Sequence, residues 1–215
     1  MQAVDGIFYV VVLIMSVVVH EFAHGYTAYL LGDNTARLSG HLTLNPIKHL
    51  DLFGSIVLPL LLVLSNAGFV IGWAKPVPYN PNNLKSGRMG SLMVAAAGIL
   101  ANLIIAISFG LLIRFAPSLL GIPLYDPNPL LTNPFYKITS IIVIMNLVLA
   151  LFNLIPIPPL DGSKILFAFL PAKYRYIENF LEQWGMFLLL FFIIFLWSSV
   201  SPIVFNAFSL LTGIN

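Results

Sequence analysis

The chain alternates between long apolar segments and shorter polar ones. Four of the apolar segments have close to the ~17–25 residues that a helix needs to cross a bilayer. They are Val4 to Leu31, Ser91 to Phe115, Ile138 to Ile155 and Trp184 to Val200. Because the charges cluster between the apolar segments, this pattern predicts four membrane-spanning helices. A short apolar tail, Ile203 to Leu211, follows Pro202 and is expected to lie at the membrane interface.

Two polar segments are predicted to be extended. From Thr35 to Pro46 polar and apolar residues partly alternate, and Gly40 fits a turn, which predicts a short β-hairpin. The segment from Gly72 to Pro81 contains three prolines, which exclude a helix and favour an edge-type strand.

Composition fixes the class of protein. Hydrophobic residues make up 59% of the 215 residues and charged residues only 8%, against about 25% charged residues in a soluble domain. The sequence therefore predicts an all-α polytopic membrane protein with one membrane-embedded domain, 1–215. Its core is expected at about 4–164 and a C-terminal helix within 184–211. The absence of cysteine excludes disulfides and thiolate metal sites. The first apolar segment lacks a basic start and a cleavage site, so we expect it to be retained.

One cluster of polar residues lies inside the first apolar segment. The sequence His20-Glu21-Phe22-Ala23-His24 reads H-E-x-x-H. On a helix the two histidines share a face and can bind one metal ion, usually zinc, and Glu21 can reach a water on that ion. The alternative is a chance pair of helical histidines. Three such residues at bilayer depth cost a few kcal/mol each unless paired or ligated, which favours the metal site.

Zinc requires a third protein ligand, and Asp161 is the best candidate. It follows an apolar helix across the proline-broken sequence Pro156-Ile157-Pro158-Pro159-Leu160. Irregular backbone at membrane depth is tolerated only where it is buried or lines a cavity. The alternative is an aspartate that only ends a helix in a turn. His41 and His49 lack a helical partner at ligand spacing and are interpreted as loop residues near the interface.

The two motifs together resemble the site-2 protease family of intramembrane zinc metalloproteases. The resemblance rests on His20-Glu21-x-x-His24 and on Asn153-x-x-Pro156-x-Pro158-x-Leu160-Asp161-Gly162. It implies that zinc is bound by His20, His24 and Asp161, that Glu21 is the catalytic base, and that Asn153 positions substrate or holds the oxyanion. Asn153 could equally cap a broken helix. We expect neither the PDZ domain nor the CBS domain of some members from this sequence, which therefore does not indicate how substrates are chosen.

The expected reaction is hydrolysis of a peptide bond in or near a transmembrane segment of a membrane-anchored protein. A helical substrate must unwind before attack, and an edge strand could hold it extended. We assign this role to the segment from Trp73 to Asn80, with Trp73, Lys75 and Tyr79 as candidate substrate-binding residues, although a plain connector is the alternative. Asn102 is interpreted as a helix–helix hydrogen-bonding residue. The rival functions are a membrane ion transporter that uses the His and Asp cluster, and an inactive scaffold.

A conflict in the topology makes a further prediction. The histidines and Asp161 lie toward the ends of their helices, so the two helices must run the same way, yet two apolar segments intervene. Leu52 to Ile71 contains Pro59 and a polar far end, so we predict that it re-enters rather than spans. Eight of the ten basic residues then share one face, which the positive-inside rule places in the cytoplasm. This predicts a protein of a prokaryotic cytoplasmic membrane whose active site opens toward the cytoplasm.

Overall fold

The computed structural model describes residues 3–57, 61, 74–121 and 133–214. Within these residues, four helical segments are long and apolar enough to cross a membrane: Phe8–Leu30, Gly87–Ser118, Pro134–Asn153 and Ala172–Thr212. The predicted all-α class and the four spanning helices are therefore confirmed, and the chain is an integral membrane protein.

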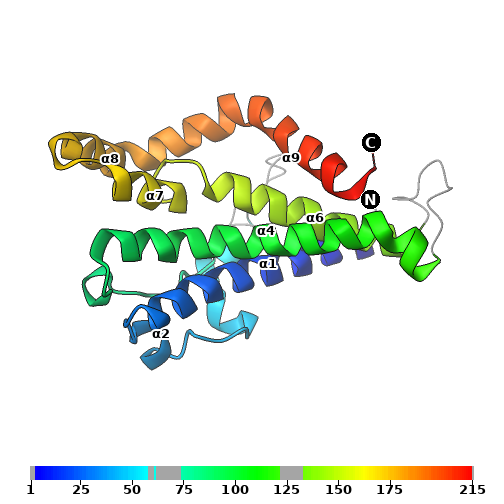
Figure 1. The fold of residues 1–215 in the computed structure, drawn as a ribbon, viewed down its shortest axis with the longest axis horizontal. Helices are drawn as coiled ribbons and strands as arrows, with labels where there is room; N and C mark the ends of the chain where they lie inside the picture. Colours follow the sequence, from blue (N-terminus) through cyan, green and yellow to red (C-terminus); the bar gives the residue numbers. More distant parts are fainter. Residues whose placement is uncertain (1–2, 58–60, 62–73, 122–132, 215) are drawn as a thin grey trace.

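Three of the spanning helices form the core that positions the polar cluster. They are α1 (Ala3–Leu30), α4 (Gly87–Leu120) and α6 (Pro134–Asn153). The helix α4 lies between the other two and packs against both, as Figure 1 shows. Its fully buried Ala95 and Ala106 present little side-chain volume. The hydrophobic effect does not drive helices together inside a membrane, so their association depends on close packing, which small residues allow.

The last spanning segment is longer than the sequence predicted. It runs through α8 (Arg175–Phe191), the π-helical turn η5 (Phe192–Leu196) and α9 (Trp197–Thr212). The prediction of an interfacial tail is wrong, because Val204 and Phe208 are buried in a cluster with residues of α4 and α6. Pro202 lies inside α9. A membrane helix tolerates a proline when neighbouring helices supply the packing, as α4 and α6 do here.

The predicted β-hairpin is also wrong. The structure shows no strand in the part of the chain that it describes, and Thr35–Leu38 forms a helical turn, α2. The Asp33 carboxylate holds the start of α2 by accepting hydrogen bonds from the Thr35 backbone N–H at 3.2 Å and its hydroxyl at 2.6 Å. Gly40 does make a turn, with φ +70°, but this turn ends α2 instead of joining two strands. The short turn η1 (Pro46–His49) follows. Local capping has outweighed the partial alternation of polar and apolar residues.

The proline-rich segment forms neither a helix nor a strand in its described part, residues 74–80, and its last residue, Asn80, has extended backbone. Its prolines exclude a helix, as predicted, and they also remove the N–H groups that a strand would pair. The remaining N–H groups bond elsewhere: Lys75 donates to the His49 carbonyl at 2.8 Å and Asn80 donates to the Asp33 carboxylate at 2.7 Å. The short turn η3 (Pro81–Asn83) leads into α4. We call residues 74–80 the extended segment.

The ends of α1 and α4 meet at one end of the bundle (Figure 1). The Lys85 N–H donates to the Leu31 carbonyl at 3.0 Å, and the Lys75 N–H reaches the His49 carbonyl at 2.8 Å. The residues on either side of the apolar segment Leu52 to Ile71 therefore lie together, as re-entry requires. The helices α1 and α6 run in the same direction along the bundle (Figure 1). The described start of the segment is a π-helical turn, η2 (Leu52–Val57). Most of it lies outside the described residues, so re-entry itself stays a prediction.

Candidate active site

His20 and His24 lie on the face of α1 that points into the bundle. Both side chains are buried, and their Nε2 atoms are 3.0 Å apart. The i, i+4 spacing puts the two imidazoles one helical turn apart on the same face. The neighbouring helix α4 makes room for them at Gly98. A Cβ atom there would lie 2.5 Å from His24 Cε1 and 2.7 Å from His20 Cε1.

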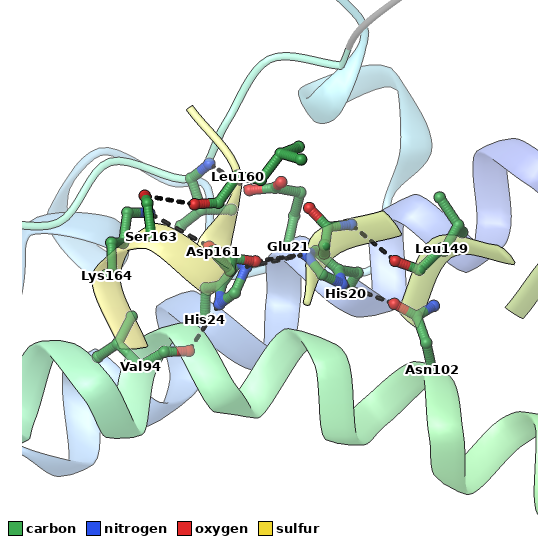
Figure 2. A network of polar contacts seen from close by, with 12 residues as sticks. His20, Glu21, His24, Val94, Asn102, Leu149, Leu160, Asp161, Ser163 and Lys164 are labelled. Atoms are coloured by element: carbon green, nitrogen blue, oxygen red, sulfur yellow. Dashed lines mark hydrogen bonds and ion pairs between the residues drawn. The ribbon is translucent and has the colours of Figure 1, made fainter. Parts of the chain in front are cut away.

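Asp161 joins the two histidines from the other side. It is the first residue of α7 (Asp161–Phe169), which begins directly after the proline-rich turn that follows α6. Its Oδ2 atom is 3.1 Å from His20 Nε2 and 2.9 Å from His24 Nε2, as Figure 2 shows. A Cβ on the next residue, Gly162, would overlap the carbonyl oxygens of Leu154 and Ile155. This glycine therefore lets α7 start against the end of α6.

The three side chains fit a zinc ion. Two imidazole nitrogens and one carboxylate oxygen are a donor set that zinc uses in catalytic sites, with one position left for water. The three donor atoms are mutually 2.9–3.1 Å apart. Ligand bonds of about 2.0–2.1 Å in a tetrahedron separate the donors by roughly 3.3 Å, so a shift of a few tenths of an ångström accommodates the ion.

The remaining ring nitrogens of both histidines are occupied, which turns the Nε2 atoms toward the centre. His24 Nδ1 lies 2.7 Å from the Val94 carbonyl, and His20 Nδ1 lies 2.6 Å from Asn102 Oδ1. Such partners fix the tautomer of a ligating histidine. The sequence interpretation of Asn102 as a helix–helix hydrogen-bonding residue is confirmed, but it did not identify His20 as the partner on α1. A signal was present, because Asn102 lies one turn after Gly98 in an apolar helix.

Glu21 lies beside the metal-binding group and is held by the extended segment. One of its carboxylate oxygens lies within 4.8 Å of a ring nitrogen of His20 and of a ring nitrogen of His24. Its Oε2 atom accepts a hydrogen bond from the Val77 N–H at 2.8 Å. Val77 lies between two prolines, so its N–H is the one that this Pro-Val-Pro sequence can offer. Gly25 allows the approach, since a Cβ there would lie 2.7 Å from Val77 Cγ1.

Two of the candidate substrate-binding residues, Lys75 and Tyr79, belong to this segment. Lys75 is exposed and Tyr79 is half-buried, with the Lys164 Nζ atom 5.6 Å from the centre of the Tyr79 ring. Trp73 lies outside the described residues. Lys164 also contacts the site directly, because its Nζ atom is 3.2 Å from Asp161 Oδ1. The sequence analysis gave no role to Lys164, and its place one turn after Asp161 was the available signal.

Asn153 is the last residue of α6, and its amide nitrogen donates to the Leu149 carbonyl of the same helix at 3.0 Å. Because this hydrogen bond is made within the same helix, it does not test the oxyanion role, which stays a proposal. The two other histidines lie elsewhere. His41 contacts the Ser39 carbonyl at 3.1 Å, while His49 is buried and contacts the Thr43 carbonyl at 2.8 Å. His49 lies in the short turn η1, and the sequence did not predict its burial.

The charges around Asp161 favour its ionised form. Burial is the largest single influence and raises the pKa of Asp161, but the hydrogen bonds of His20 and His24 and the charge of Lys164 together bring it well below the usual value. For Lys164 the directions are reversed: burial lowers the pKa of the ammonium group, but the negative charge of Asp161 outweighs this and raises that pKa above its usual value. An ionised carboxylate is the form that binds a metal ion.

Known proteins with similar sequences point to one family. Residues 118–196, which include Asn153 and Asp161, match the model described as "Peptidase family M50". "Putative zinc metalloprotease YwhC" of Bacillus subtilis is 43% identical over 195 residues, or 90% of this chain and 80% of that protein. The similarly named Rip2 of Mycolicibacterium smegmatis is 29% identical over 193 residues, or 88% of this chain and 68% of that protein. No solved structure shows significant similarity to the chain.

Proposed function

Because this chain belongs to peptidase family M50, the site-2 protease family of zinc metalloproteases, we propose that it hydrolyses peptide bonds in or near transmembrane segments of membrane-anchored proteins. The protein is a zinc-dependent metalloprotease embedded in the membrane. The proposal concerns its substrates and the roles of its residues. The observation that carries it is the convergence of His20, His24 and Asp161, with Glu21 beside them, on helices of the membrane bundle.

The proposed ligands are His20, His24 and Asp161. When bound there, zinc supplies Lewis-acid chemistry, which acidifies water and polarises a carbonyl group. Val94 and Asn102 keep the imidazoles turned inward, and Lys164 engages the Asp161 oxygen that does not face the histidines. These contacts support a site that is oriented before substrate arrives, so that little reorganisation is needed during the reaction.

Glu21 is proposed to take a proton from the attacking water and later to give it to the leaving amine. The Val77 N–H that bonds its Oε2 atom keeps the carboxylate beside the metal-binding group. Asn153 is proposed to donate a hydrogen bond to the oxyanion. To do so, its amide must exchange the Leu149 carbonyl for the substrate.

The extended segment is proposed to hold substrate by its backbone. A helical substrate hides its carbonyl groups in internal hydrogen bonds, so a stretch of it must become extended before attack. The segment lies beside Glu21, and its prolines favour extended backbone, which supports its use as a binding edge. Lys75 and Tyr79, and Trp73 outside the described residues, are the candidate substrate contacts.

The basic residues support an orientation in which the site opens toward the cytoplasm. If both ends of the re-entrant segment lie on one side, eight of the ten Lys and Arg residues share that side, and only Arg114 and Lys137 remain opposite. The positive-inside rule then places the eight in the cytoplasm. We propose a location in a prokaryotic cytoplasmic membrane. Cysteine labelling at Ser39 and Tyr79 tests this, because the chain has no native cysteine. Labelling of the two positions from opposite sides would contradict re-entry.

The test of function compares the wild type with Glu21→Gln during co-expression with candidate single-pass membrane proteins. We expect cleavage by the wild type and a rate about 10²–10⁴-fold lower for the variant, which loses a general base but keeps the zinc ligands. Zinc content, measured in both purified proteins, should be equal. Equal cleavage by both proteins would refute the proposed role of Glu21. Zinc-dependent cleavage of only soluble proteins would refute the proposed substrate class. If the protein were instead a transporter, cleavage of the co-expressed proteins would not differ between the wild type and Glu21→Gln. None of the contacts described at the site favours this alternative.

A further inference from the structure

A buried polar network extends from His20 into the centre of the bundle, away from the extended segment. It consists of Ser16 on α1, Asn102 on α4 and Asn146 on α6. Asn102 and Asn146 are fully buried, and Ser16 is 5% exposed. Polar side chains inside a membrane bundle are costly and are retained where they have a function. The network joins all three core helices, and only one of its members, Asn102, contacts His20 Nδ1.

The hydrogen bonds of Asn146 can run in only one direction. Its Nδ2 atom is 2.8 Å from the Ile142 carbonyl and 2.9 Å from Ser16 Oγ. A carbonyl oxygen can only accept, so the amide nitrogen must face it. Both amide hydrogens are then used, and Asn146 Oδ1 is left to face Asn102. The orientation of Asn146 is therefore set by the backbone of its own helix.

Asn146 in turn sets the orientation of Asn102. Asn102 Nδ2 donates to Asn146 Oδ1 at 2.8 Å, with a longer contact of 3.4 Å to the Ser16 carbonyl. The oxygen of Asn102 consequently faces His20 Nδ1 at 2.6 Å. That nitrogen must carry a hydrogen, which leaves a lone pair on Nε2, the atom that faces Asp161 and His24. His24 needs no such chain, because its Nδ1 atom contacts a backbone carbonyl directly.

We propose that Asn146 is a positioning residue for the metal site, which acts through Asn102 to fix the tautomer and ring orientation of His20. The inference rests on the proposed role of His20 as a zinc ligand. If Asn146 is lost, only the longer 3.4 Å contact with the Ser16 carbonyl still holds the Asn102 nitrogen in place, so the amide can turn more readily toward His20, and the imidazole then loses its acceptor. Outer partners of this kind typically change metal affinity by about 10–100-fold.

The test measures the zinc dissociation constant by competition with a chelator. Asn146→Leu should weaken zinc binding by about 10–100-fold. The matched control is Ser140→Ala, which removes another buried polar group from α6 whose Oγ atom has no hydrogen-bond partner among the described residues. This control should bind zinc within about twofold of the wild type, because it lacks the link to His20. Wild-type zinc affinity in Asn146→Leu would refute the proposal.

A second background separates positioning from packing. In Asn102→Asp both carboxylate oxygens are acceptors, so the group can receive the His20 Nδ1 hydrogen whichever way it turns. Adding Asn146→Leu to Asn102→Asp should then change zinc affinity by less than about threefold, far below the effect expected in the native background. An equal loss in both backgrounds would mean that Asn146 acts by packing, and would overturn the proposal.

Two further measurements keep the outcome unambiguous. If the leucine variant does not fold, Asn146→Ser gives the same comparison, because its shorter side chain also withdraws the acceptor from Asn102. The melting temperature of each metal-free variant identifies those that fold. A wild type that binds no zinc would refute the metal site itself, whereas a zinc-binding wild type with an unaffected Asn146→Leu refutes only the role of Asn146.

Discussion

The metal-binding group has two unlike sides. On the inner side, the ring nitrogens of His20 and His24 meet buried partners that belong to the spanning helices, Asn102 and the Val94 carbonyl. On the outer side, Glu21 and Asp161 meet groups that lie outside those helices, the Val77 N–H and the Lys164 ammonium. The inner side has the contacts that fix metal geometry, and the outer side has those that can reach water and substrate. Changes on the inner side should therefore affect metal binding, and changes on the outer side, apart from those at the proposed ligand Asp161, should affect rate.

The largest effect is expected where the two sides meet. Asp161→Ala removes the carboxylate that contacts both histidines, so zinc affinity should fall by more than the ~10–100-fold caused by losing an outer partner, and cleavage should fall to background. Zinc content and peptide cleavage measure this. The control is Glu178→Ala, which removes a carboxylate paired with Arg88 and should keep both. Full metal and full activity in Asp161→Ala would show that another group is the third ligand.

Asn153→Ala should separate rate from metal binding. The side chain bonds to its own helix and is proposed to turn toward the oxyanion. Its loss should lower the cleavage rate by roughly 10²–10³, as the loss of one oxyanion donor typically does, while zinc affinity stays near the wild-type value. Single-turnover cleavage at saturating substrate measures the rate. A wild-type rate would reduce Asn153 to a residue that only stabilises the end of α6.

Gly98→Ala tests the inner side by volume alone. The new methyl group would lie 2.5 Å from His24 Cε1, so both imidazole rings must shift away from α4. We expect zinc affinity to fall by about 10–100-fold, as for other changes that misorient a ligand. Chelator competition measures it. Gly90→Ala is the control in the same helix, because its methyl group meets the side chain of Leu84, with 3.0 Å to the nearest atom, instead of a histidine.

Gly25→Ala is the corresponding test on the outer side. The added methyl group would lie 2.7 Å from Val77 Cγ1 and should push the extended segment away from Glu21. We expect about a tenfold loss of rate, a fraction of what a general base contributes, with zinc binding unchanged. Gly110→Ala provides a comparable clash, 2.8 Å from Leu211 Cβ, in a different part of the bundle. A loss of zinc in Gly25→Ala would remove the distinction between the two sides.

The smallest effect concerns Asp33, which anchors the far end of the extended segment. Burial raises its pKa, but the hydrogen bonds from Thr35, Asn83 and Asn80 outweigh this and lower it below the usual value. A carboxyl with a lowered folded pKa stabilises the fold above its unfolded pKa of about 3.9, and this stability is lost as pH falls below that value.

Asp33→Asn should therefore lower the melting temperature at pH 7, since an amide nitrogen would face one of these donors, at a cost of about 1–3 kcal/mol. It should also reduce the acid dependence of stability. Thermal unfolding in detergent between pH 7 and pH 3 measures both effects. An unchanged acid dependence would show that Asp33 does not set it.

Much of this protein could be read from its sequence because the bilayer restricts what an apolar segment can do. Apolar runs of spanning length must form helices there, and the i, i+4 spacing of His20 and His24 puts both on one face of any helix. The proline-broken sequence before Asp161 pointed to the residue that the structure brings within 3.1 Å of both Nε2 atoms. The hairpin was misread because local capping by Asp33 outweighed the alternation of polar and apolar residues, and the interfacial tail was misread because the burial of Phe208 depends on distant residues of α4 and α6.

The sequence by itself determined the class of protein, the spanning helices and the residues that can hold zinc, because hydropathy, periodicity and donor chemistry are local properties. Only the tertiary structure decided which groups surround them. Asn102 contacts His20 across 82 residues of sequence, Val77 contacts Glu21 across 56, and Asn146 contacts Ser16 across 130. Such contacts arise from the packing of α4 and α6 on α1 and from close approach at Gly25 and Gly98. No local pattern encodes which helix faces which, so the orientation of the ligands became visible only in the assembled bundle.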